Sequence, residues 1–174
     1  MKFTDIEPYI QGGNYQVNVN IRYLQETLDD YAEGYGLELN PDFQRGHVWT
    51  EEQQIKYVEF FLRQGVSSRI IYFNSPEFGS KKGIDIDTRT IVCVDGLQRL
   101  TALLNFVNNK LKVFGYYYSE FEDKPNLSTM TIVFNVNSLT TKKDLLTWYI
   151  QLNDGGTPHS KEEIERVKNM LSSL

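Results

Sequence analysis

The sequence contains few of the residues that build metal centres or covalent cross-links. Cys93 is the only cysteine, and His47 and His159 are the only histidines. A single cysteine excludes an internal disulfide framework and cysteine-rich zinc sites, and two histidines argue against a histidine-rich metal centre. Cys93 lies inside the apolar run 90–94, so we expect an inert, packed thiol rather than a reactive one.

Long apolar runs and an excess of positive charge are also missing. No run reaches the length of a membrane span, and the first ten residues, MKFTDIEPYI, lack the apolar core of a signal peptide. We therefore expect a cytoplasmic protein. The 18 Lys and Arg residues against 23 Asp and Glu give a net charge of −5. This balance argues against a broad surface that coats nucleic acid, although it is compatible with a local basic groove.

The remaining composition is that of an ordinary globular protein, with 40% hydrophobic and 24% charged residues among 174. A chain of this length buries a sizeable core and matches one domain, which we expect to span residues 1–174. Residues 75–88 are rich in Pro, Gly, Lys and Asp, a composition that predicts an exposed loop insertion.

Hydrophobic periodicity predicts helices and strands interleaved without a strict βαβ alternation, which indicates an α+β fold with a mixed sheet. Thr50 and Gln53 have the form of a capping box at the start of one helix. In the helix expected over 97–109, the apolar stripe is Leu100, Leu103, Leu104 and Val107. The other helices are expected over 21–33, from Thr50 to Gly65, over 141–152 and after Ser160; the strands are expected over 15–19, 69–74, 90–94, 111–114 and 132–136.

The segment from Val94 to Arg99 is the clearest candidate for an anion-binding site, because a buried strand leads there directly into a helix. Such a turn exposes unpaired backbone N–H groups at the positive end of the helix dipole. Gly96 permits close approach of a phosphate, and Arg99 offers a fork of donors to close over it. The plainer alternative is that Asp95 only caps the helix and Arg99 only forms an ion pair. Spacing alone slightly favours that alternative.

Two further segments carry polar residues on loops. Residues 40–49 place Gln44 and Arg45 between an extended segment and a helix, with Trp49 as an apolar plug or a face for a base. Residues 153–158 place Asn153 before a Gly-Gly turn, which serves either as a helix end or as a clamp that brings Asn153 to the same pocket.

Together, these segments resemble a known family. The residues Asn40-Pro41, Gln44-Arg45 and Trp49, the run 95–103 (DGLQRLTAL), and Asn153 with the run 155–158 (GGTP) are similar to the signatures of the DUF262 domain. This is the N-terminal domain of GmrSD-type, modification-dependent restriction enzymes, within the ParB/sulfiredoxin-like superfamily. The order of these motifs and the spacing between them agree with those of the family over about residues 15–170.

The resemblance implies a ParB/sulfiredoxin-like mixed sheet flanked by helices, with a turn of the form Asp-Gly-x-Gln-Arg that holds nucleotide phosphates. It also implies NTP hydrolysis or NTP-gated activity in defence against phage or foreign DNA. Family members commonly have Gln where this chain has Leu97; if that side chain faces the pocket, hydrolysis is the property affected. Those enzymes also carry a C-terminal HNH nuclease domain, and the chain has no such His-rich motif. We therefore expect neither the complete restriction enzyme nor DNA cleavage. Leu97 and Gln98 stand at the Cys-His positions of the sulfiredoxin turn, which excludes sulfiredoxin chemistry.

The leading hypothesis is a Mg²⁺-dependent NTP- or dNTP-binding domain with NTPase activity. Asp95, Arg99 and Arg45 are its candidate catalytic residues, with Mg²⁺ on Asp95. The candidate nucleotide contacts are Gln44, Arg45, Gly96, Leu97, Gln98, Arg99 and Asn153. One alternative is a non-catalytic DNA-binding module that uses a patch of Arg63, Arg69, Lys81, Lys82 and Arg89. Another is a stand-alone phage or mobile-element protein that binds a defence complex. The candidate partners are thus a nucleotide, DNA, a separate nuclease or defence protein, or a second copy of the chain.

Overall fold

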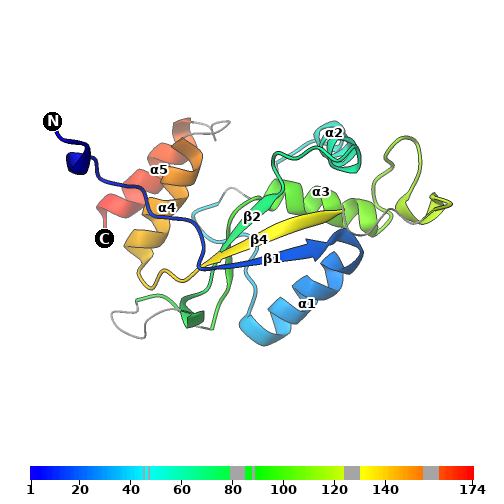
Figure 1. Ribbon diagram of the computed structural model, residues 1–174. Helices are drawn as coiled ribbons and strands as arrows, with labels where there is room; N and C mark the ends of the chain where they lie inside the picture. Colours follow the sequence, from blue (N-terminus) through cyan, green and yellow to red (C-terminus); the bar gives the residue numbers. More distant parts are fainter. Residues whose placement is uncertain (45, 47, 79–84, 88, 124–129, 155–160) are drawn as a thin grey trace.

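The computed structural model describes residues 1–44, 46, 48–78, 85–87, 89–123, 130–154 and 161–174 (Figure 1). Helices and strands alternate irregularly along these residues, which confirms the expected α+β class. The strands are β1 (Tyr15–Asn20), β2 (Ile70–Asn74), β3 (Val92–Asp95) and β4 (Thr131–Asn137); the α-helices are α1 (Leu24–Tyr35), α2 (Glu51–Leu62), α3 (Leu97–Val107), α4 (Lys142–Asp154) and α5 (Lys161–Ser172).

The four strands form one mixed sheet, as expected. Their order is β1-β4-β2-β3, in which β1 and β4 are antiparallel, β4 and β2 parallel, and β2 and β3 antiparallel. Glu38 pairs with Val92 through a parallel bridge and so covers the outer edge of β3. The 95–99 turn therefore leaves the sheet from the last strand of this order.

The sheet packs between two groups of helices (Figure 1). Helices α1, α2 and α3 contribute to one apolar cluster, whereas α4 and α5 form a second cluster beside β3. Cys93 belongs to the first cluster and Val94 to the second, and both are completely buried. The expectation that this strand is buried on both faces is confirmed. It follows that β3 delivers Asp95 to a point between the two helical groups.

Local signals in the sequence explain several element boundaries. The capping box is present at α2, where the Thr50 N–H donates to Gln53 Oε1 at 2.9 Å and the Gln53 N–H donates to Thr50 Oγ1 at 3.3 Å. The strand expected over 111–114 is wrong: Val113 and Tyr116 instead exchange backbone hydrogen bonds across a two-residue turn. Leu111 and Val113 are apolar because they fill the first cluster, not because they pair in the sheet.

The core-facing stripe of α3 also differs from the expected one. Leu100 and Leu103 are fully buried as expected, but Leu104 is only partly buried. The buried face extends instead to Leu97 and Phe106. The reason is that α3 contacts both α2 and the sheet, so its apolar face is rotated from the stripe that spacing alone suggested.

Candidate functional site

The turn between β3 and α3 has the geometry that the sequence suggested. Gly96 is the N-cap of α3, with φ 107° and ψ 6°, and as a glycine it has no side chain that could cap the helix. A Cβ at position 96 would lie 2.6 Å from Ile71 Cδ1, so only glycine fits here without strain. The turn therefore places the first-turn N–H groups of α3 beside Gly96, and the Leu97 N–H among them lies against the Cys93 thiol.

Arg99 and Asp95 form an ion pair across this turn. Arg99 Nη2 donates to Asp95 Oδ2, and the two side chains keep 17% and 23% of their exposure, respectively. This is the plainer arrangement that the sequence analysis weighed against phosphate binding. Both partners nevertheless reach solvent, so an incoming ligand can compete for them without opening the core. Arg45, expected on the opposite side of the pocket, lies outside the described residues.

Three tyrosines lie within electrostatic reach of the pair. Burial raises the pKa of Tyr72, the charge of Asp95 raises it further, and Arg99 lowers it. Burial also raises the pKa of Tyr57 to about 12, against the lowering effect of Arg99 and Arg69. Burial is likewise the first cause of the raised pKa of Tyr149, to which Glu163 and Asp95 add. These phenols remain protonated at neutral pH. Two of them already donate within the protein, Tyr57 to the Ser68 carbonyl and Tyr149 to Glu163 Oε1, each at 2.9 Å.

Two residues predicted to contact nucleotide have side chains that hold the neighbouring loop. Gln98 Oε1 accepts hydrogen bonds from the N–H groups of Val48 at 2.9 Å and Trp49 at 3.0 Å. Gln98 Nε2 donates to the carbonyl of Gly46 at 2.7 Å. Gln44 Nε2 donates to the carbonyl of Cys93 on β3. Their amides thus fasten the 40–49 loop to the 95–99 turn, an arrangement that brings two of the three sequence segments together.

The third segment is placed differently. Asn153 is buried near the end of α4, where its Nδ2 donates to the Tyr149 carbonyl at 2.6 Å, within its own helix. The Gly-Gly turn that follows lies outside the described residues. A residue that sequence reasoning missed, Arg166 of α5, contacts the 40–49 loop directly through the carbonyls of Asp42 and Phe43. No short-range pattern signals a contact between residues so far apart in the chain.

Leu97 and Cys93 point into the apolar interior. Leu97 is 7% exposed and belongs to the first cluster, so its side chain does not face a pocket at the turn. Any contact that residue 97 makes with a phosphate would therefore use its backbone N–H. Cys93 is fully buried, and burial raises the pKa of its thiol to about 12. The expectation of a packed, inert thiol is confirmed.

Arg69, one residue of the basic patch proposed for DNA, has a structural role. The guanidinium of Arg69 donates to the backbone carbonyls of Gly65, Phe61 and Thr131. It is thus committed to holding the end of α2 against the sheet. Lys81 and Lys82 lie outside the described residues.

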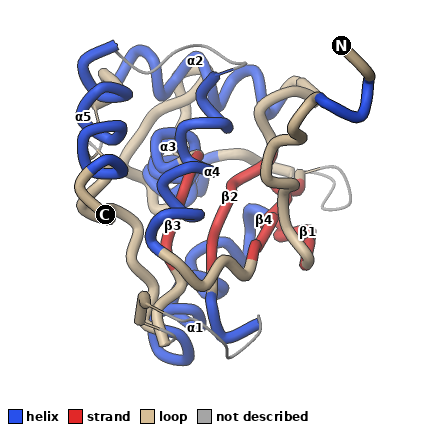
Figure 2. The backbone as a smooth tube through the Cα atoms, turned by 90° about the vertical axis from the view of Figure 1, so that its left-hand side faces the viewer, coloured by secondary structure: helices blue, strands red, loops and turns tan. Residues whose placement is uncertain are grey.

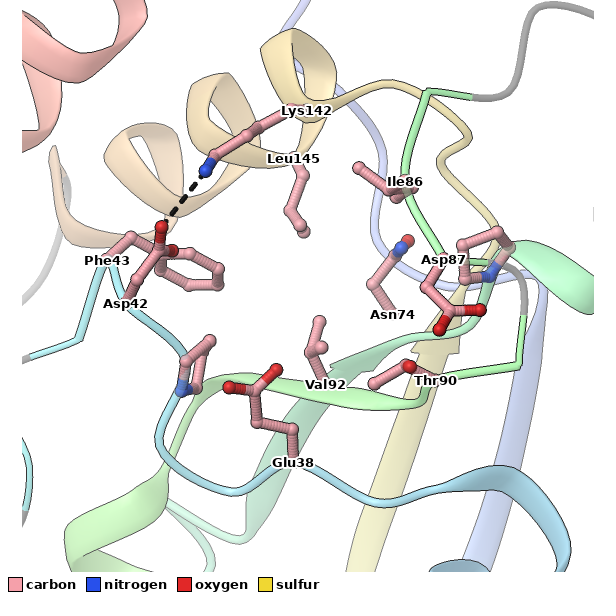
Figure 3. A pocket seen from close by; sticks show the side chains of 12 residues that line it. Glu38, Asp42, Phe43, Asn74, Ile86, Asp87, Thr90, Val92, Lys142 and Leu145 are labelled. Carbon is pink, nitrogen blue, oxygen red and sulfur yellow. Dashed lines mark hydrogen bonds and ion pairs between the residues drawn. The ribbon is translucent and has the colours of Figure 1, made fainter.

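A separate cavity of about 160 Å³ opens beside Val92, at the opposite end of β3 from Asp95 (Figure 3). Among its described lining residues are the carboxylates of Glu38, Asp42 and Asp87 and one cation, Lys142, which pairs with Asp42 at 3.0 Å. A phosphate would meet excess negative charge there. Nor does the described part of the chain contain a group of three His, Cys, Asp or Glu residues placed to hold a metal ion.

Comparison with known proteins gives one match. No curated protein and no solved structure matches the chain, and no helix among the described residues combines the length and apolarity needed to cross a bilayer. The sequence model of the family described as "GmrSD restriction endonuclease, N-terminal domain" matches residues 24–131. That region spans more than half of the chain and includes both the 40–49 loop and the 95–99 turn. The chain therefore belongs to the GmrSD N-terminal domain family of DUF262 type.

Proposed function

We propose that this restriction-related domain binds the phosphates of a nucleoside triphosphate at the 95–99 turn and hydrolyses the nucleotide with Mg²⁺. The observation that carries the proposal is the partly exposed Asp95–Arg99 pair beside a helix N-terminus whose N-cap is a glycine. It combines an anion-binding backbone, a cation and a carboxylate in one turn of chain.

The backbone supplies the first part of the argument. The helix dipole and the N–H groups of the first turn favour an anion at the start of α3. Gly96 has no Cβ, so a phosphate oxygen can approach these N–H groups closely. The guanidinium of Arg99, at the end of the same turn, can then bind the phosphate through two parallel hydrogen bonds.

The negative charge of Asp95 determines the conditions under which an anion binds at the turn. In the free protein its carboxylate neutralises Arg99, so a bare phosphate must compete with it. Mg²⁺ binds proteins through one or two carboxylates together with waters and substrate phosphates. Arg99 engages only Oδ2 of Asp95, which fits a carboxylate that also serves as a metal ligand. Asp95 would hold the Mg²⁺, which would offset the negative charge of the phosphates.

The remaining roles follow from the sequence segments. We assign Arg45 as the second positive contact, whereas Asn153, whose amide is bonded within α4, receives no role at the nucleotide. Gln44 and Gln98 support the nucleotide by shaping the 40–49 loop with their side-chain amides. In the cell, the domain would act in defence against phage or foreign DNA, together with a separate nuclease or defence protein.

A thermal-shift panel of all NTPs and dNTPs, with and without Mg²⁺, tests the proposal. A ligand at 100 times its Kd stabilises a protein by about 2.7 kcal/mol, so binding is easy to see. We expect the wild type to respond only when nucleotide and Mg²⁺ are both present. Asp95→Asn should bind nucleotide with little dependence on Mg²⁺, whereas the exposed control Asp87→Asn should behave as the wild type.

Two results would contradict the proposed nucleotide-binding function. Absence of a shift with every nucleotide, with or without Mg²⁺, would remove the proposed function. Salt-dependent binding of DNA without any nucleotide effect would favour the alternative of a DNA-binding module.

A further inference from the structure

Helix α5 contacts the candidate site although it lies beyond residues 24–131, the region that the family match covers. It packs beside α4 on one side of the sheet (Figures 1 and 2). The amphipathic face of α5 enters the second apolar cluster through the fully buried Val167. The helix thus has a docked position, and its polar residues next to that face are fixed relative to β3.

Arg166 uses that position to hold the 40–49 loop. Its Nη1 donates to the carbonyl of Asp42 at 2.9 Å and its Nη2 donates to the carbonyl of Phe43 at 2.7 Å. One planar guanidinium therefore binds two consecutive backbone carbonyls. A fork of this kind fixes both the position and the direction of the chain. The next residue along the chain is Gln44.

The side chain of Phe43 is held by the same pair of helices. It is almost fully buried, and its ring lies against that of Tyr149 on α4, with centroids 5.3 Å apart at an angle of 65°. The Tyr149 hydroxyl donates to Glu163 Oε1 at 2.9 Å, one turn of α5 before Arg166. Backbone and side chain of residue 43 are therefore both positioned by α4 and α5.

The loop has two other anchors, one to β3 and one from α3. Gln44 is tied to the Cys93 carbonyl on β3, and Gln98 of α3 binds Gly46, Val48 and Trp49. The described residues Gln44 and Gly46 thus lie between the contacts of Arg166 and those of Gln98. Loss of the Arg166 fork removes the contacts that hold the backbone of residues 42 and 43 to α5.

We propose that Arg166 is a positioning residue for the nucleotide site, and that docking of α5 is coupled to nucleotide binding at the 95–99 turn. The inference rests on the proposed function. Because such coupling is reciprocal, the nucleotide stabilises the docked α5 by the same factor by which α5 docking improves nucleotide affinity. The C-terminal helix is then a place where a partner can regulate the site by holding or releasing the 40–49 loop.

Amide hydrogen exchange in the nucleotide-free protein tests the first half of the inference. We expect Arg166→Ala to speed exchange of the Gln44, Val48 and Trp49 amides by on the order of tenfold or more, because opening of the loop becomes easier. Arg166→Lys should give partial protection, since one ammonium replaces the two-carbonyl fork. The matched control is Lys168→Ala, which removes only an exposed pair with Glu165 on the same helix and should leave the loop unchanged.

Titration with nucleotide and Mg²⁺ tests the second half. Arg166→Ala should weaken binding about tenfold, the effect of losing one or two hydrogen bonds that shape the site, and nucleotide should slow exchange in α5 of the wild type. Unchanged loop exchange in Arg166→Ala would overturn the inference whether or not nucleotide binds. Faster loop exchange with unaltered affinity would overturn the coupling. A wild type that binds no nucleotide would refute the proposed function and the coupling, while loop exchange would still report separately on Arg166 as an anchor.

Discussion

Replacement of Gly96 by alanine should strongly destabilise the fold, and the structure gives the two reasons. The residue has φ 107°, in the region that side chains other than glycine rarely occupy. The added Cβ would also lie 2.6 Å from Cδ1, 3.2 Å from Cγ2 and 3.3 Å from Cα of Ile71. Ile71 is fully buried in the first cluster, so its side chain has little space to move away.

The magnitude follows from these two contributions. A non-glycine residue in the left-handed region costs roughly 1–2 kcal/mol. Forcing an extra methyl group into a packed core costs typically about 1–3 kcal/mol. We therefore expect the free energy of unfolding to fall by about 2–5 kcal/mol, which for a chain of this size lowers Tm by on the order of 5–15 °C.

Thermal and urea denaturation followed by circular dichroism measure this loss. Gly34→Ala is the matched control, because Gly34 lies in α1 with nothing within 4 Å of a built Cβ. This control should gain up to about 1 kcal/mol from the better helix propensity of alanine. Ile71→Val removes the atom of closest approach, so it should cost less in the Gly96→Ala background than in the wild type. A Gly96→Ala protein as stable as the wild type, or no coupling with Ile71→Val, would refute this reasoning.

Three further predictions concern the core and its titratable groups. Leu103→Ala should lower the free energy of unfolding by about 2–5 kcal/mol and Leu104→Ala by clearly less in denaturant titrations, because only Leu103 is fully buried. Cys93, whose thiol pKa burial raises to about 12, should resist thiol reagents at pH 8 in the native state and react once denatured; rapid native labelling would contradict its burial. Burial raises the pKa values of Tyr57 and Tyr149 above their ordinary value of 10.0. The stability that they contribute is therefore complete below that pH and is lost as the pH rises through the raised pKa values, about 12 for Tyr57. Tyrosinate absorbance should then show a late, unfolding-linked step, and complete titration near pH 10 with unchanged circular dichroism would contradict this.

Elements with local signals were predictable from the sequence. The Thr50–Gln53 capping box, the buried strand around Cys93 and the strand-Gly-helix turn at Gly96 each depend on residues a few positions apart. Helix or strand propensity, capping and burial all favour the same structure at these places. A local prediction succeeds where such independent signals agree.

Predictions failed where distant segments decide what a residue does. An apolar alternation at Leu111 and Val113 looks like a strand, but these side chains fill a core that other elements build. Leu104 fits the helical stripe but lies at the margin of the face that α2 and the sheet bury. Short apolar runs are compatible with either outcome, because periodicity does not show which neighbour covers them.

In the candidate site, too, a contact between residues close in the sequence was predictable, whereas contacts between distant residues were not. The pairing of Asp95 with Arg99 is an i, i+4 contact, and the sequence analysis had weighed it as the plainer alternative. The contacts of Gln98 and Arg166 with the 40–49 loop join residues about 50 and 123 positions apart. Such side-chain-to-backbone bonds have no sequence period and appear only once the chain is folded.

The measurement that tests the central claim most directly is a calorimetric titration of Arg99→Ala with a nucleoside triphosphate and Mg²⁺. Arg89→Ala is the control, because Arg89 is 90% exposed and removal of its charge leaves the 95–99 turn intact. We expect both variants to remain folded, and Arg99→Ala to lose at least about tenfold in affinity, as the loss of a charge-assisted phosphate contact requires. Arg99→Lys should recover only part of that loss. Unchanged affinity in a folded Arg99→Ala protein would contradict the assignment of the 95–99 turn as the phosphate site.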